Sequence, residues 1–297
     1  MHTSKKVFYI LAFCLALLLL VAFLLIPKSP KNLSPKIVTT NFISYDFARA
    51  VTGDSNSIKM LINPGSEIHD FEPTPEDIIA INNSELFIYV GGESDNWVFD
   101  LLKNNEISPE KTLRLMDFVE QRKDDEHIWT SLPNSIKLIR EIEEKLVSLF
   151  PEKHTQYSEN AENYIARLTK TDQEIREIVD NSNKKELIFA DSFPFLYFVE
   201  EYGLNYFSAF PGCDEHSEPN ANAISELIDK VKADNLKVVL KIELTNGKLA
   251  NLVAEETGAK VLELNAAHNI SREDFEKSLT FADIMEKNVE VLREALS

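Results

Sequence analysis

Residues 154–180 read HTQYSENAENYIARLTKTDQEIREIVD and contain neither proline nor glycine. They continue a charged helical pattern that starts near Pro133 and is interrupted at Phe150-Pro151, because proline disfavours a helical conformation in the residue before it. At about 1.5 Å per residue, a helix over 154–180 would be roughly 40 Å long. Such a helix can join two lobes as a rigid strut, although the same pattern fits a surface helix of a single domain.

On both sides of this helix, short β-branched or aromatic runs alternate with amphipathic stretches, which is typical of α/β lobes with mostly parallel sheets. Strands are predicted at 36–40, 57–62, 86–90 and 112–116, and again at 186–189, 205–209, 238–242 and 260–264. Helices are predicted at 45–51, 74–82 and 96–103 before the long helix, and at 193–202, 221–233, 248–257 and 272–296 after it.

The predicted fold class is therefore α/β, with two similar lobes joined by a long rigid helix. A chain of 297 residues exceeds what one hydrophobic core usually serves. The predicted division is an N-terminal segment and linker over 1–34, an N-terminal α/β lobe over 35–150, a connecting helix over 151–182 and a C-terminal α/β lobe over 183–297.

The N-terminal segment carries Lys5 and Lys6, followed by an uninterrupted apolar run from Val7 to Ile26. Roughly 20 helical residues span a bilayer, so the run predicts a transmembrane anchor, although a long signal peptide cut between Pro27 and Ser34 fits as well. The two lysines place the N-terminus inside and the chain from about residue 30 outside the cell. Cys14 lies within the apolar run, so Cys213 is the only cysteine of the exported part and no disulfide is expected there.

The formal net charge of −18 argues against nucleic acid as a partner and favours the attraction of cations. In an exported, acidic chain with few cysteines, histidines are the expected ligands of a transition metal. His69 lies in the loop Pro64–Pro75 at the carboxyl end of a predicted strand, where open α/β sheets place ligands. His127 follows the acidic run Asp124–Glu126 and precedes Ile128-Trp129.

The loop Pro64–Pro75 and the motif Glu126-His127-Ile128-Trp129 resemble the substrate-binding proteins of zinc and manganese ABC importers (cluster A-I, solute-binding protein family 9). The order of motifs matches from Lys36 to the C-terminus. The resemblance implies two α/β lobes, a metal ion in the cleft between them, and His69 and His127 as its first two ligands. The third and fourth ligand positions of the family match Ala190 and Asn265, and neither residue supplies the expected donor.

Residues near those two positions offer replacements. His268 lies three residues beyond Asn265 on the same predicted loop, and Glu243 ends the adjacent strand. The predicted site is His69, His127 and His268 with one carboxylate, Glu243 first and Asp191 second; either carboxylate also fits the role of acceptor for a histidine N–H. The resemblance places His216 in a loop at the rim of the cleft, where it either assists metal entry or is simply solvated.

The predicted function is an extracytoplasmic, membrane-attached binding protein that captures zinc, or else manganese, and passes it to an ABC permease. We expect a monomer without enzymatic activity. Two alternatives are an extracellular zinc-dependent hydrolase with Glu243 as its base, and an adhesin or module for a larger ligand that uses aromatic side chains such as Trp97 and Tyr206. The hydrolase has little support, because no His-Glu-x-x-His or Gly-x-Ser-x-Gly motif is present.

Overall fold

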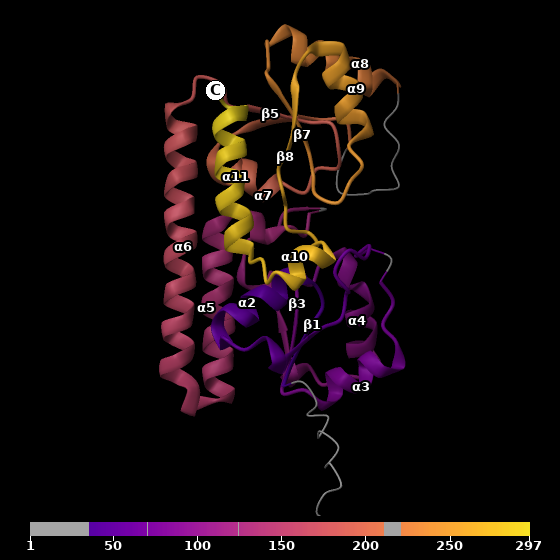
Figure 1. Ribbon diagram of the computed structural model, residues 1–297. Helices are drawn as coiled ribbons and strands as arrows, with labels where there is room; N and C mark the ends of the chain where they lie inside the picture. The colour runs from indigo at the N-terminus through magenta and orange to yellow at the C-terminus, as the bar shows by residue number, and fades with distance from the viewer. Residues whose placement is uncertain (1–35, 70, 124, 211–220) are drawn as a thin grey trace, which may run out of the picture. The chain divides into compact units, whose positions relative to one another are not determined.

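The computed structural model describes residues 36–69, 71–123, 125–210 and 221–297, and residues 35–297 form one compact unit. Two α/β lobes with four-stranded parallel sheets lie one after the other along the same side of a long helix, and the helix joins them as predicted (Figure 1). The two sheets have the same topology, with strand orders β2-β1-β3-β4 and β6-β5-β7-β8. In each sheet the first strand lies between the second and the third, so the direction of winding changes there and a ligand is expected at the carboxyl ends of the strands.

The first lobe begins with β1, whose three residues are all buried, as expected for a parallel strand covered on both faces. Helix α2 follows at once, because Asn41 and Ser44 form a capping box at its start. The strands of this lobe are β1 (Ile37–Thr39), β2 (Ile58–Met60), β3 (Leu86–Tyr89) and β4 (Thr112–Arg114). Its helices are α2 (Phe42–Thr52), α3 (Pro75–Asn83), α4 (Asn96–Lys103) and α5 (Leu132–Leu149).

The predicted long helix is α6 (His154–Asn181), which contains 28 residues and is therefore about 42 Å long. It packs against α5 and α2 of the first lobe and against α11 (Phe281–Ala295) at the end of the chain (Figure 1). One continuous apolar core runs from residues such as Phe47 and Leu138 in the first lobe to Phe189 and Phe281 in the second. The helix thus joins two lobes that also share a core.

The second lobe repeats the alternation. Its strands are β5 (Glu186–Phe189), β6 (Asn205–Ser208), β7 (Val238–Lys241) and β8 (Lys260–Glu263). Its helices are α7 (Leu196–Tyr202), α8 (Ala221–Ala233), α9 (Lys248–Thr257), α10 (Arg272–Glu276) and α11.

The prediction of one closing helix over 272–296 is wrong, because the structure has α10 and α11 with a break between them. Ser278 has a left-handed backbone with φ 58°, which no α-helix accommodates in its interior. Thr280 then starts α11 through a capping box with Asp283. The break lets the chain turn from the carboxyl edge of the second sheet back along α6.

Among the residues that the structure describes, no helix has the length and apolar character needed to cross a membrane. The apolar run from Val7 to Ile26, which carries the predicted anchor, lies outside those residues. The anchor and the predicted domain boundaries therefore stay predictions.

Candidate metal site

The three predicted histidine ligands lie on loops that follow three different strands. His69 comes after β2, His127 after β4 and His268 after β8. All three loops leave the carboxyl ends of parallel strands, so each lobe turns the same kind of sheet edge toward the site.

The loop of His69 is fixed by its own side chains and by the second lobe. The Glu67 carboxylate accepts hydrogen bonds from the backbone N–H groups of Ile68, at 2.9 Å, and His69, at 3.1 Å. The side-chain amide of Asn269, next to His268, donates to the carbonyl of Ser66. The two loops are thus tied together, and His69 is the exposed member of the histidine group.

His127 is held by the aspartate two residues before it. Oδ1 of Asp125 accepts from the backbone N–H of His127 at 2.7 Å and lies 3.0 Å from Nδ1 of its ring. With Nδ1 carrying the proton toward a carboxylate, Nε2 is the nitrogen left for a metal, as in most histidine metal sites. The residue is only 2% exposed, and its ring packs edge-on against Trp129 with centroids 5.2 Å apart.

His268 lies in a loop with a constrained backbone. Ala267, directly before it, has a φ of 55°. The Glu243 carboxylate accepts from the backbone N–H groups of Ala266 at 2.8 Å and His268 at 2.7 Å. Trp129 donates from Nε1 to the carbonyl of Ala266 at 2.7 Å, and its ring stacks on His268 with centroids 6.4 Å apart. The first lobe thereby helps to position a histidine of the second.

The three imidazole rings converge. The ring centroid of His268 lies 5.3 Å from that of His69 and 4.9 Å from that of His127. Burial lowers the pKa of His268 well below its usual value, and the neighbouring His127 and His69 lower it further. Nε2 of His268 is buried and has no hydrogen-bond partner among the residues that the structure describes. A neutral imidazole with an unsatisfied buried nitrogen is the state that binds a metal ion.

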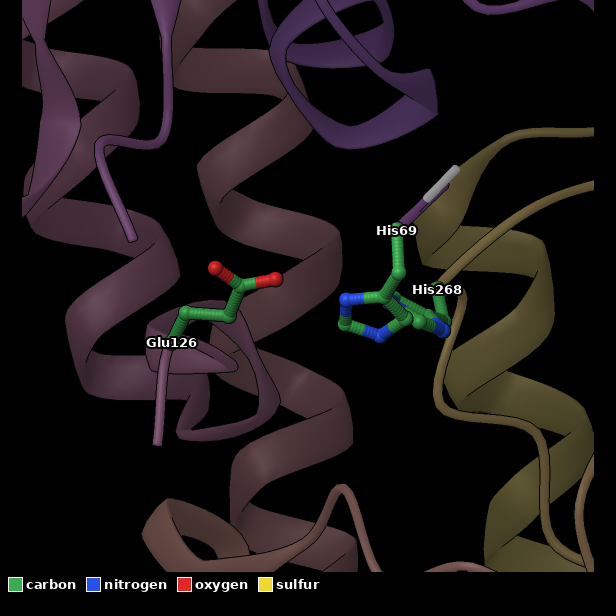
Figure 2. Close-up of side chains that lie close together, drawn as sticks. All are labelled: His69, Glu126 and His268. Carbon is green, nitrogen blue, oxygen red and sulfur yellow. The ribbon is translucent and has the colours of Figure 1, made fainter. Parts of the chain in front are cut away.

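Glu126 adds a carboxylate that was not among the predicted ligands. One of its oxygens and one ring nitrogen each from His69 and His268 all lie within 4.8 Å of one another. Figure 2 shows the Glu126 carboxylate pointing toward these two rings. The available signal in the sequence was its position directly before His127, but it also ends an acidic run that resembles a solvated surface.

The surroundings of Glu126 are tight and acidic. The backbone N–H of Ser94 donates to Oε2 of Glu126 at 3.0 Å. Asp95 is also buried, and this burial raises its pKa to about 7, to which the nearby charge of Glu126 contributes. The backbone N–H of Gly91 donates to Asp95 at 2.8 Å and opposes that rise.

The two predicted carboxylate ligands are engaged elsewhere. Both oxygens of Glu243 accept from the loop of His268, and burial raises its pKa to about 6. Oδ2 of Asp191 accepts from the Thr245 hydroxyl at 2.5 Å, and Oδ1 accepts from the backbone N–H of Ser192 at 3.0 Å. Neither residue belongs to the group formed by His69, Glu126 and His268. His127 is not in that group either, but its ring lies 4.9 Å from the ring of His268, centroid to centroid. Glu243 thus positions backbone rather than accepting from a histidine ring, and ligation by either residue stays a prediction.

The two positions that lack the expected family ligands have structural roles. Ala190 is 2% exposed and lies in the apolar cluster of the second lobe. Oδ1 of Asn265 accepts from the backbone N–H of Ala267 at 2.7 Å and so stabilises the loop that carries His268. His216 lies outside the described residues, so its expected place at the rim stays a prediction.

Comparisons with known proteins identify the family and support the two-lobed fold. Residues 37–295 match the family model of ZnuA, the zinc-uptake complex component A, periplasmic. The high-affinity zinc uptake system protein ZnuA of Bacillus subtilis (strain 168) is 30% identical over 279 residues, which cover 88% of this chain and 87% of that protein. The crystal structure of the metal-dependent lipoprotein YcdH from Bacillus subtilis has a TM-score of 0.78 and 29% identity, covering 88% of this chain and 99% of that chain.

A third relative is AdcA of Streptococcus pneumoniae. Its Zn(II)-bound ZnuA-like domain has a TM-score of 0.76 and 27% identity, covering 88% of this chain and 98% of that domain. The chain spans only 61% of the length of the full zinc-binding lipoprotein AdcA from strain R6, with 28% identity over 98% of this chain. The match to the family model covers most of the chain, so the chain belongs to the ZnuA family of substrate-binding proteins for metal import, whose members are not enzymes.

Proposed function

We propose that this chain captures a divalent transition metal outside the cell and delivers it to an ABC permease, with zinc as its preferred cargo and manganese as the alternative. The observation that carries the proposal is the convergence of His69, His127 and His268 from three strand ends. Within the described part of the chain, the buried Nε2 of His268 has no hydrogen-bond partner. Three imidazole nitrogens suit tetrahedral zinc, whereas manganese favours more oxygen ligands. The relatives named for zinc support the same preference.

Capture requires little reorganisation of the histidines. His268 is neutral at neutral pH because its pKa is lowered, so it binds a metal ion without first losing a proton. Asp125 already orients the ring of His127. The chelating side chains therefore supply most of the affinity in this proposal.

The lobes are proposed to close only slightly around the cargo. The shared apolar core, the Trp129 bond to Ala266 and the Asn269 bond to Ser66 all cross between the lobes. A wide hinge motion would break these contacts together with the packing of α6 on both lobes. The apolar run Val7–Ile26 is proposed to hold this unit, as a monomer, at the outer face of the membrane beside its permease.

The proposal is tested by titrating the full-length chain, purified in detergent, with zinc and with manganese in competition with a chromophoric chelator. We expect one tight zinc site in the unaltered chain. Losing a residue that only orients a metal ligand typically lowers metal affinity by roughly 10–100-fold. Loss of a ligand itself should cost more, so His69→Ala, His127→Ala and His268→Ala should each lower zinc affinity by more than that range.

The control is His154→Ala, which removes an exposed histidine at the start of α6 and should leave zinc affinity unchanged. Absence of a tight site in the unaltered chain would refute metal capture. A site that survives all three ligand substitutions would place metal binding elsewhere in the chain.

A further inference from the structure

We propose that Glu126 is the fourth ligand of the metal, so that the loop after β4 contributes two adjacent donors, Glu126 and His127. This inference rests on the proposed function, because it concerns the same metal site. The three histidines leave one of four coordination positions unfilled, and Glu126 would fill it. The resulting set of three nitrogens and one oxygen is a normal tetrahedral environment for zinc.

The positions of the donor atoms support this assignment. Zinc bonds to histidine nitrogen and carboxylate oxygen are about 2.0–2.2 Å long, which places the donor atoms of a tetrahedral site roughly 3.3 Å apart. The donor atoms of Glu126, His69 and His268 already lie within 4.8 Å of one another. The remaining difference of at most 4.8 − 3.3, or about 1.5 Å, is within reach of small side-chain rotations.

The burial of Glu126 also points to a cation. Glu126 is only 7% exposed. No lysine or arginine in the described parts of the chain forms an ion pair with its carboxylate. Within the same parts, the carboxylate accepts a single hydrogen bond, from the backbone N–H of Ser94 to Oε2. A buried carboxylate with so little compensation is costly, and a divalent ion between it and the histidines supplies the missing charge.

The backbone beside Glu126 is shaped to hold it. A Cβ atom on Gly92 would lie 2.1 Å from Oε2 of Glu126 and 2.2 Å from its Cβ. Gly92 has a φ of −89°, a value that any residue adopts, so glycine is required there by space and not by backbone conformation. Gly92 and the N–H of Ser94 thus form a close-fitting cradle that aims Glu126 at the histidines.

The other carboxylates near the site are less suitable. Glu243 uses both oxygens to hold the backbone of Ala266 and His268, and turning it toward a metal would leave two buried N–H groups without acceptors. Asp191 is bonded to Thr245 and Ser192. Glu126 is therefore the carboxylate that can bind a metal without disturbing the loop that presents His268.

The test compares Glu126→Gln with Glu243→Gln and Glu93→Gln in the full-length chain, using zinc competition and the visible absorption of bound cobalt(II). Glu126→Gln keeps the size of the side chain and an acceptor for Ser94. We expect it to weaken zinc binding by roughly 100-fold or more, beyond the range of about 10–100-fold typical of residues that only orient ligands. It should also change the cobalt spectrum, which reports the donor atoms directly.

The two controls distinguish metal ligation by Glu126 from the loss of a negative charge near the site and from the loss of contacts that hold the loop of His268. Glu93 is exposed and lies one residue from Gly92, so Glu93→Gln removes the same charge and should leave affinity and spectrum unaltered. Glu243→Gln should weaken binding but keep the cobalt spectrum. If Glu126→Gln does not fold by circular dichroism, Gly92→Ala provides the second variant, because it displaces the carboxylate without removing it.

The outcomes distinguish the two proposals. Tight zinc binding by the unaltered chain with affinity and cobalt spectrum unchanged in Glu126→Gln would overturn the assignment of Glu126 and leave metal capture standing. A changed cobalt spectrum in Glu243→Gln, with none in Glu126→Gln, would transfer the ligand role to Glu243. No zinc or cobalt binding by the unaltered chain would refute both proposals.

Discussion

Gly92 and Glu126 belong to different loops of the first lobe, yet the size of one fixes the position of the other. The backbone of Gly92 lies against the side chain of Glu126 so closely that a single added carbon atom would overlap it. Nothing in the sequence around Gly92 indicates this contact, because the two residues are 34 positions apart. Glu126 was missed for a related reason: in an acidic run, a residue that turns inward has the same sequence pattern as one that faces water.

Gly92→Ala is expected to push Glu126 away from the histidines and to weaken zinc binding about 10-fold or more, the effect typical of changes just outside the ligands. The measurement is zinc affinity by chelator competition. Gly203→Ala is the matched control: it places a side chain at a φ of 62°, where no described atom lies within 4 Å. It should therefore lower stability by about 1–2 kcal/mol without changing affinity. Equal affinity loss in both variants would mean that general destabilisation is responsible.

At the scale of elements, the strands and most helices follow from alternation and capping, and the strand ends correctly indicated where the histidines gather. The sequence pattern is less informative about side chains of one element that hold the backbone of another. Glu243, at the end of β7, holds the backbone that follows β8, a contact between neighbouring strands that no local pattern records. The break between α10 and α11 was missed because Ser278 is an ordinary residue in an unusual backbone conformation.

Glu243→Ala tests this support. It leaves the buried N–H groups of Ala266 and His268 without acceptors, which should lower the free energy of unfolding by about 2–6 kcal/mol at roughly 1–3 kcal/mol per group. Denaturant unfolding in the presence of a chelator measures the effect. Glu263→Ala is the control, because its ion pair with Lys241 is partly exposed and is worth no more than about 1 kcal/mol. Comparable losses in the two variants would argue against the loop-holding role.

Considered as a whole, the described part of the chain is held together across its lobes by α6 and by the continuous core. Such a scaffold keeps neutral His268 buried when no metal is present. This burial lowers the stability of the folded chain at low pH. The unfolded chain binds a proton at His268 below a pKa of 6.5, whereas the folded chain does not, because its His268 pKa is lowered. Stability from this residue is therefore fully present above pH 6.5 and is lost as the pH falls.

Glu243 and Asp95 act in the opposite direction, because their raised pKa values of about 6 and about 7 favour the folded state as the pH falls. The contribution of His268 is isolated by comparing the unaltered chain with His268→Gln, both metal-free. Between pH 7.5 and pH 5.5 the unaltered chain should lose about 1.4 kcal/mol more stability than the variant. Parallel pH profiles, measured by denaturant unfolding, would show that His268 takes up a proton in the folded state.

Trp129 has a further consequence for how this molecule can be observed. The chain has two tryptophans; Trp97 packs among Phe71 and Phe87 in the first lobe, whereas Trp129 contacts both His127 and His268. With Trp97 replaced by phenylalanine, all indole emission would come from a ring lying against two of the histidines. The protein then carries its own fluorescent reporter, and the arrival of cargo can be followed by light without any attached dye.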